Sequence, residues 1–248
     1  MISSLILKIN KLKITLQEDL DKYYKKRRNK KMPELRRRFR KKIREIEEST
    51  EKLSTLTIDN YKESIELFHN YNDEQYKIIE ENTNRIVKES KEIYSMSVKI
   101  LAMEQPVATD LRFVANTIKI ANHLKRIGKL SFNMAEIANE IEIEKIPKKP
   151  LDSMDQMAQE VENMLNRSIR SYLTKNPEEA AELEEDDDIV DDLFDEFLVT
   201  VTKAMKEDTS TINTLVPFLL IARYLERIAD RSESIGGRVL LMQKYHTE

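Results

Sequence analysis

Acidic side chains at two places in the second half of the sequence have the spacing of a helix face. Asp187 and Asp191 are four residues apart, and so are Glu226 and Asp230. Residues four apart share one face of a helix, so two antiparallel neighbouring helices would bring all four carboxylates together. Two carboxylates about 5 Å apart repel by roughly 3 kcal/mol at an effective dielectric near 20. Such a cluster therefore favours raised pKa values or a bound cation.

The chemistry of such a site follows from its oxygen ligands. Oxygen donors suit Mg, Mn or Fe, and Zn is also possible. The chain has no cysteine and only three histidines, and no second histidine lies at ligand spacing. The alternative hypothesis is that residues 184–196 form a solvated acidic face and that Glu226 pairs with a nearby arginine.

Motifs of common enzyme classes are missing from the sequence. It has no G-x-S-x-G segment, and its three glycines do not form a phosphate-binding loop. We therefore do not expect an enzyme.

The elements that would position the acids are helices. The 248 residues include only 3 Gly and 6 Pro, with 35% charged residues, a composition typical of an all-α protein. Helical spacing of apolar residues and short breaks predict three helices in each half. The expected helices cover residues 35–70, 73–103, 108–141, 151–174, 177–206 and 210–244.

The two halves are related in sequence. A shift of 101 residues places the segment 120–127 on the segment 221–228, with four apolar residues and one arginine in register. This match predicts two tandem repeats of an antiparallel three-helix bundle. We expect residues 1–32 to be an N-terminal basic extension, 33–143 the first bundle, 144–150 a linker and 151–248 the second bundle. Within residues 1–32, a short hairpin competes with a helix, and we favour the helix.

Two motifs in the repeats resemble a known family. The run from Gln105 to Arg112, QPVATDLR, is similar to the Q-P-V-A-x-D-L-R signature of the PhoU family. The run from Arg223 to Asp230, RYLERIAD, is similar to the R-x-L-E-R-I-x-D signature of its third helix. The resemblance implies a tandem three-helix-bundle fold. It also implies a regulator of phosphate uptake and phosphate-responsive signalling that acts beside a phosphate transporter and a sensor kinase, and we expect a homodimer.

The resemblance also implies metal-binding carboxylates on the second and third helices of each bundle. In the second bundle the matching residues are Asp187, Asp191, Glu226 and Asp230. In the first bundle all four matching positions lack an acid, so a divalent or trivalent ion (Fe, Zn, Mn or Mg) is expected in the C-terminal bundle only. These first-bundle positions are Thr83, Val87, Lys125 and Lys129.

The roles of the remaining charged residues are less specifically indicated by the sequence. We expect structural ion pairs at charged positions of the two motifs and of the repeated segment 120–127, namely Arg126, Arg227, Asp110 and Arg112. Residues 22–44 hold 14 Lys or Arg and one acid, so this segment could be solvated, pair with another subunit, contact anionic lipid, or bind nucleic acid in an alternative function. Its principal basic residues are Lys25, Lys26, Arg27, Arg28, Arg36, Arg37 and Arg38.

The location of the protein is suggested by what the sequence lacks. No apolar run approaches the roughly 20 residues of a membrane span, and the N-terminus does not resemble a signal peptide. We expect a cytoplasmic protein that could still be peripheral to a membrane.

Overall fold

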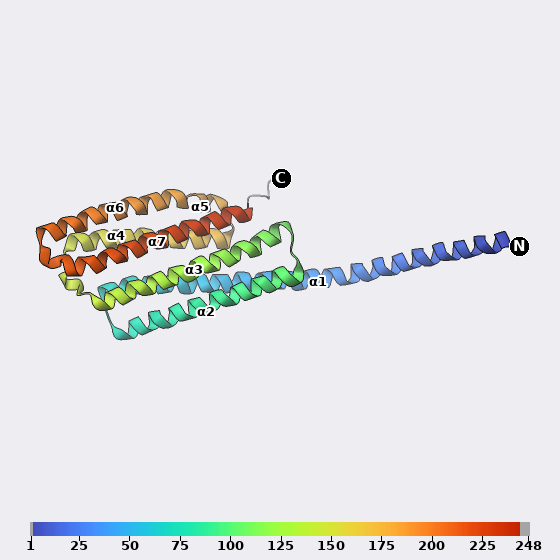
Figure 1. Cartoon of the computed structure of the whole chain (residues 1–248), viewed down its shortest axis with the longest axis horizontal. Helices are drawn as coiled ribbons and strands as arrows, with labels where there is room; N and C mark the ends of the chain where they lie inside the picture. The colour runs from blue at the N-terminus through green and yellow to red at the C-terminus, as the bar shows by residue number, and fades with distance from the viewer. Residues whose placement is uncertain (1, 244–248) are drawn as a thin grey trace. The chain divides into compact units, whose positions relative to one another are not determined.

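The computed structural model describes the backbone of residues 2–243 and the side chains of residues 34 and 36–242. The described chain consists of helices and contains no strand, which confirms the predicted all-α fold (Figure 1). None of its described helices is both long and apolar enough to span a membrane. The elements are α1 (Ile2–His69), α2 (Asp73–Glu104), α3 (Ala108–Glu140), the 3-10 helix η1 (Ile143–Lys145), α4 (Lys148–Thr174), α5 (Pro177–Ala181), α6 (Leu183–Glu207), the 3-10 helix η2 (Thr209–Thr211) and α7 (Ile212–Gln243).

Contacts divide the chain into residues 1–45 and residues 46–248. The border lies inside α1, and both bundles belong to the second unit. The domain borders expected from the sequence stay predictions. All packing described below lies within residues 46–248.

Local sequence signals set several of the helix boundaries. Asn72 caps α2 by accepting a hydrogen bond from the backbone N–H of Gln75 at 2.7 Å. At its other end α2 stops before Gln105, which adopts a left-handed conformation with φ of 46° and precedes Pro106. Asn176 caps α5 in the same way, with Pro177 in the first helical turn.

Three helices differ from the expected ranges. The helix α1 begins at Ile2 rather than at residue 35, so a helix and not a hairpin covers the N-terminal segment. The helix expected over residues 177–206 is broken at Glu182 into α5 and α6. The break lies where this segment packs tightly on α7, because a Cβ added at Gly236 would lie 2.9 Å from the carbonyl oxygen of Ala180. The helix α4 begins three residues early, at Lys148, because Pro150 is accommodated in its first turn. The expected linker is therefore partly helical.

The core is built from stripes of buried residues along each helix. In α2 the buried positions alternate in steps of three and four, which is the spacing of a left-handed helical bundle. Isoleucine alternates there with small hydroxyl residues, and Ser90 donates a hydrogen bond to the carbonyl oxygen of Ala121 on α3 at 2.9 Å. The buried residues of α2 are Ile79, Thr83, Ile86, Ser90, Ile93, Ser97 and Ile100.

The two bundles pack on one another through α3 and α7, while α2 packs on α3, and α4 and α6 pack on α7 (Figure 1). Contacts between the bundles include a 2.8 Å hydrogen bond that the hydroxyl of Tyr61 donates to the carbonyl oxygen of Ala158. The ring of Phe218 stacks on that of Phe68, with centroids 5.5 Å apart. The halves thus share one continuous core, which fixes α6 and α7 as neighbours.

Candidate metal site in the second bundle

Neighbouring helices carry the predicted acids. The helix α6 contributes Asp187 and Asp191, and α7, which packs on it, contributes Glu226 and Asp230. Asp187 interrupts the buried apolar stripe of α6, four residues after Leu183, so its side chain is held partly inside the bundle. The helix periodicity therefore places a carboxylate where an apolar side chain would fit the packing.

The electrostatics of Asp187 indicate that the four predicted acids lie together. The pKa of Asp187 is raised to about 7, first by burial and then by the nearby carboxylates, in the order Glu233, Asp191, Asp230 and Glu226. Each of the other three predicted acids acts on the Asp187 carboxyl. The four carboxylates are therefore close enough to act on one another electrostatically, while their role as a site stays a prediction.

Glu233 is a member of this cluster that the sequence analysis missed. Among the charges that raise the pKa of Asp187, its effect is the largest. Its own pKa is raised by burial and then by acids that include Asp230 and Asp191. The signal was available in the sequence, because Glu226, Asp230 and Glu233 follow one another at steps of four and three residues on one helix face.

The two carboxylate oxygens of Glu226 differ in their surroundings. Arg223, one turn earlier on α7, forms an ion pair with Oε1, as the alternative hypothesis expected. Oε2 is buried and has no hydrogen-bond partner. Burial raises the pKa of Glu226, followed by the charge of Asp230, although Arg223 acts in the opposite direction.

The donor set fits a hard cation in chemistry but is not assembled around one point. Among the described residues, no three Asp, Glu or His side chains are gathered closely enough to hold a metal ion. A buried carboxylate oxygen without a partner is, however, costly, and Oε2 of Glu226 lies close to further carboxylates that a cation would neutralise. Binding would require these side chains to move closer together, and metal binding stays a prediction.

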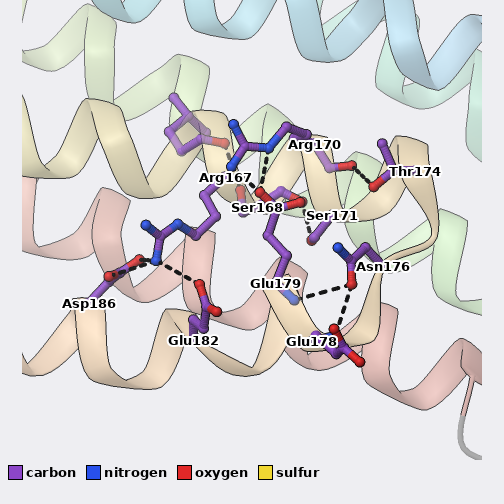
Figure 2. Close-up of polar contacts among 11 residues, drawn as sticks. Arg167, Ser168, Arg170, Ser171, Thr174, Asn176, Glu178, Glu179, Glu182 and Asp186 are labelled. Atoms are coloured by element: carbon purple, nitrogen blue, oxygen red, sulfur yellow. Dashed lines mark hydrogen bonds and ion pairs between the residues drawn. The ribbon is translucent and has the colours of Figure 1, made fainter.

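Three acids that precede this cluster, which we call the acidic block, are held by two arginines from α4 (Figure 2); the acids are Glu179, Glu182 and Asp186. Arg167 forms ion pairs with Asp186 at 2.8 Å and with Glu182 at 3.3 Å. Arg170 forms an ion pair with Glu179. These ion pairs distinguish the acidic block from the cluster around Asp187, where the described ion pair is that of Arg223 with Glu226.

The equivalent positions of the first bundle have a different arrangement. Thr83 is buried, and its hydroxyl donates a hydrogen bond to the carbonyl oxygen of Gly128 at 3.3 Å and accepts one from Nδ2 of Asn60 at 3.0 Å. Val87 and Lys125 are half-buried, whereas Lys129, the fourth equivalent residue, is exposed.

The residues expected in structural ion pairs give a mixed picture. Arg126 and Arg227 are exposed, as is Asp110, and none of the three lies within 4.0 Å of an oppositely charged group among the described side chains. Arg227 nevertheless acts on Glu226, whose pKa it lowers. Arg112 is half-buried. Structural ion pairs at these four positions stay predictions.

The basic segment is described only in part. Arg36, Arg37 and Arg38 are exposed, and Arg38 forms an ion pair with Glu34 at 2.8 Å. The side chains of the other four predicted basic residues, Lys25, Lys26, Arg27 and Arg28, lie outside the described residues. Nucleic-acid binding stays a prediction.

Comparison with known proteins assigns the chain to a family. Residues 50–138 and residues 154–239 each match the PhoU domain. The Phosphate-specific transport system accessory protein PhoU homolog 1 of Methanothermobacter thermautotrophicus is 40% identical over 204 residues, which are 82% of this chain and 93% of that relative. The chain belongs to the PhoU family. The two PhoU domain matches confirm the duplicated unit and the resemblance seen in its motifs.

Other PhoU proteins extend the comparison. The Phosphate-specific transport system accessory protein PhoU homolog of Clostridium acetobutylicum is 27% identical over 201 residues, covering 81% of this chain and 91% of that protein. Crystal structures of PhoU from Pseudomonas aeruginosa and of the phosphate transport system regulatory protein PhoU from Streptococcus pneumoniae superpose with TM-scores of 0.79 and 0.76, each at 20% identity and over 83% of this chain. The superpositions cover 99% and 96% of those two chains, respectively, and support the fold described above.

Proposed function

We propose that this PhoU protein is a regulator of phosphate uptake and of phosphate-responsive signalling. The supporting observation is the 40% identity, over most of both chains, to a protein named as an accessory protein of a phosphate-specific transport system. A regulator of this kind acts by binding a transporter component or a sensor kinase rather than by catalysing a reaction, in the cytoplasm and close to the membrane. A homodimer is part of this proposal.

A metal ion in the second bundle would support this role. Asp187 and Asp191 from α6 and Glu226 and Asp230 from α7 would hold it, with Glu233 beside them. The ion would neutralise their mutual repulsion and connect α6 to α7. Of the chain's own residues, Arg223 holds one oxygen of Glu226 and leaves the other available to a cation.

The role is tested in the organism that carries the protein. Deletion should raise uptake of labelled phosphate and activate the phosphate-starvation response, and a plasmid copy of the wild type should restore both. An affinity-tagged copy should co-purify with a component of the phosphate transporter or with its sensor. Unchanged uptake and signalling in the deletion strain would refute the proposed role.

The contribution of the metal is tested by complementation with matched variants. The double variant Asp187→Asn, Glu226→Gln should restore regulation poorly. Asp192→Asn changes an exposed acid of the same helix and should complement like the wild type. Equal complementation by both would separate the regulatory role from the carboxylate cluster.

A further inference from the structure

Basic side chains gather where α3 of the first bundle meets α7 of the second. His123 on α3 is half-buried, and so are Arg231 and Arg238 on α7. Lys119 and Arg126 extend the group to the exposed surface of α3. We call these five residues the α3–α7 basic cluster.

Helix periodicity explains why the cluster forms. Positions 119, 123 and 126 follow one another at steps of four and three residues and so share one face of α3. Positions 231 and 238 are seven residues apart and share one face of α7. Because α3 and α7 pack on each other, the two faces bring cations from both bundles together.

Several polar atoms of the cluster lack partners. Nδ1 of His123 and Nε of Arg238 are buried without a hydrogen-bond partner. None of the four Lys and Arg side chains of the cluster lies within 4.0 Å of a described carboxylate. The arginines of α4 that contact the acidic block behave differently, since Arg167 and Arg170 both form ion pairs. Buried donors without acceptors and unneutralised charges are unfavourable unless a ligand completes them.

The charged groups that act on the imidazole of His123 are cations. The pKa of His123 is lowered to about 4, first by burial and then by the charges of Arg231, Arg238, Arg126 and Lys119, in that order. The largest charge effects on the imidazole are therefore all cationic, and they come from α3 and α7 alone. An anion among them would reverse the shift and allow the imidazole to donate from both nitrogens.

We propose that the α3–α7 basic cluster binds a phosphate group, either as inorganic phosphate or as a phosphate ester. A phosphate dianion offers several acceptor oxygens, and guanidinium groups bind such oxygens in pairs. The anion site is inferred from the cluster itself, whereas its assignment to phosphate rather than another oxyanion rests on the proposed function. Because its ligands come from both bundles, a bound phosphate would connect the two halves of the protein.

Calorimetric titration of the full-length protein at low ionic strength tests the site with inorganic phosphate, a nucleoside monophosphate and sulfate. The double variant Lys119→Gln, Arg238→Gln should weaken phosphate binding at least tenfold. The control double variant Arg85→Gln, Lys203→Gln removes the same charge from exposed cations on α2 and α6 and should bind within twofold of the wild type. Circular dichroism should confirm that both variants are folded.

The pattern of binding decides the ligand. Tighter binding of inorganic phosphate than of sulfate supports free phosphate, and tighter binding of the monophosphate supports a phosphate ester. Equal binding of sulfate and phosphate overturns the phosphate assignment. No binding of any anion at millimolar concentration, or equal binding by the two double variants, overturns the site. These outcomes are independent of the uptake measurement, so the site and the regulatory role can fail separately.

Nuclear magnetic resonance gives a second readout at the cluster. The imidazole signal of His123, assigned by its loss in His123→Gln, should titrate near pH 4 in the absence of phosphate. Saturating phosphate should move that midpoint up by at least one pH unit. An unchanged His123 midpoint at saturating phosphate overturns the proposal.

Discussion

The two bundles place opposite chemistry at equivalent positions. Thr83 in the first bundle closes a neutral set of hydrogen bonds with Asn60 and the Gly128 carbonyl. Asp187 in the second bundle lies among four other carboxylates that raise its pKa. The helix packing around the two positions is the same kind of three-helix arrangement, so the fold itself does not require a cluster of acids.

This difference indicates that the position of Asp187 lowers the stability of the fold, whereas that of Thr83 does not. Every described polar contact of Thr83 is neutral and internal, whereas Asp187 carries a charge that burial and its neighbours disfavour at neutral pH. Strongly shifted carboxyl groups that converge from two elements are typical of functional sites. We expect the position of Thr83 in the first bundle to serve packing only, and the position of Asp187 in the second bundle to respond to cations.

The largest expected effect concerns the contact between the bundles. Phe218 is fully buried and its ring lies between those of Phe68 and Phe197. Phe218→Ala should lower the free energy of unfolding by about 4 kcal/mol, because it removes a large core side chain and leaves a cavity. The equivalent first-bundle residue is Thr117, and Thr117→Val should cost only about 1 kcal/mol. Urea denaturation measures both losses of unfolding free energy. Equal losses would contradict the expected difference between the two bundles at this position.

A medium effect is expected at the neutral position of the first bundle. Thr83→Val should cost about 2 kcal/mol, since it leaves the buried amide of Asn60 without its hydroxyl partner. The loss should be the same from pH 5 to pH 8 and with or without divalent metal. Thr55→Val, which changes an exposed hydroxyl on α1, is the control and should change stability by less than about 0.5 kcal/mol. A loss that depended on metal would place a site in the first bundle.

The smallest expected effect has the opposite sign. A carboxyl group whose pKa is raised in the folded state from 3.8 to about 7 favours folding at low pH, and this contribution disappears as the pH rises towards 7. In metal-free buffer at pH 8, Asp187→Asn should therefore raise the free energy of unfolding by about 1 kcal/mol after allowance for solvent screening.

The pH profile of that gain is its control. The stabilisation by Asp187→Asn should shrink as the pH falls from 7 towards 4. Asp192→Asn, at an exposed position of the same helix, should show little change at any pH. A gain that did not depend on pH would mean that repulsion among the carboxylates is not its cause.

Most of the fold could be predicted because its signals are local. Apolar periodicity and the short breaks between apolar runs located the helices, and the arginine in register between segments 120–127 and 221–228 revealed the repeat. Spacing alone placed Asp187 beside the acids of α7, because residues four apart share a helix face.

The parts that were missed depend on contacts between distant segments. The break at Glu182 coincides with the close approach of Gly236, and the ion pairs of Arg167 and Arg170 join α4 to residues that are nearby only in the fold. The spacing of apolar residues along one helix does not indicate which residues of another helix it will contact. Glu233 was missed for a different reason, since its spacing fitted the cluster but lay beyond the family motif.

Elemental analysis of purified protein by mass spectrometry tests the asymmetry between the bundles most directly. The wild type and Thr83→Val should retain the same amount of divalent or trivalent metal, and the double variant Asp187→Asn, Glu226→Gln should retain less than a tenth of it. Equal metal content in all three proteins, or a wild type that binds none when dialysed against Mg, Mn, Fe and Zn in turn, would contradict a metal site in the second bundle.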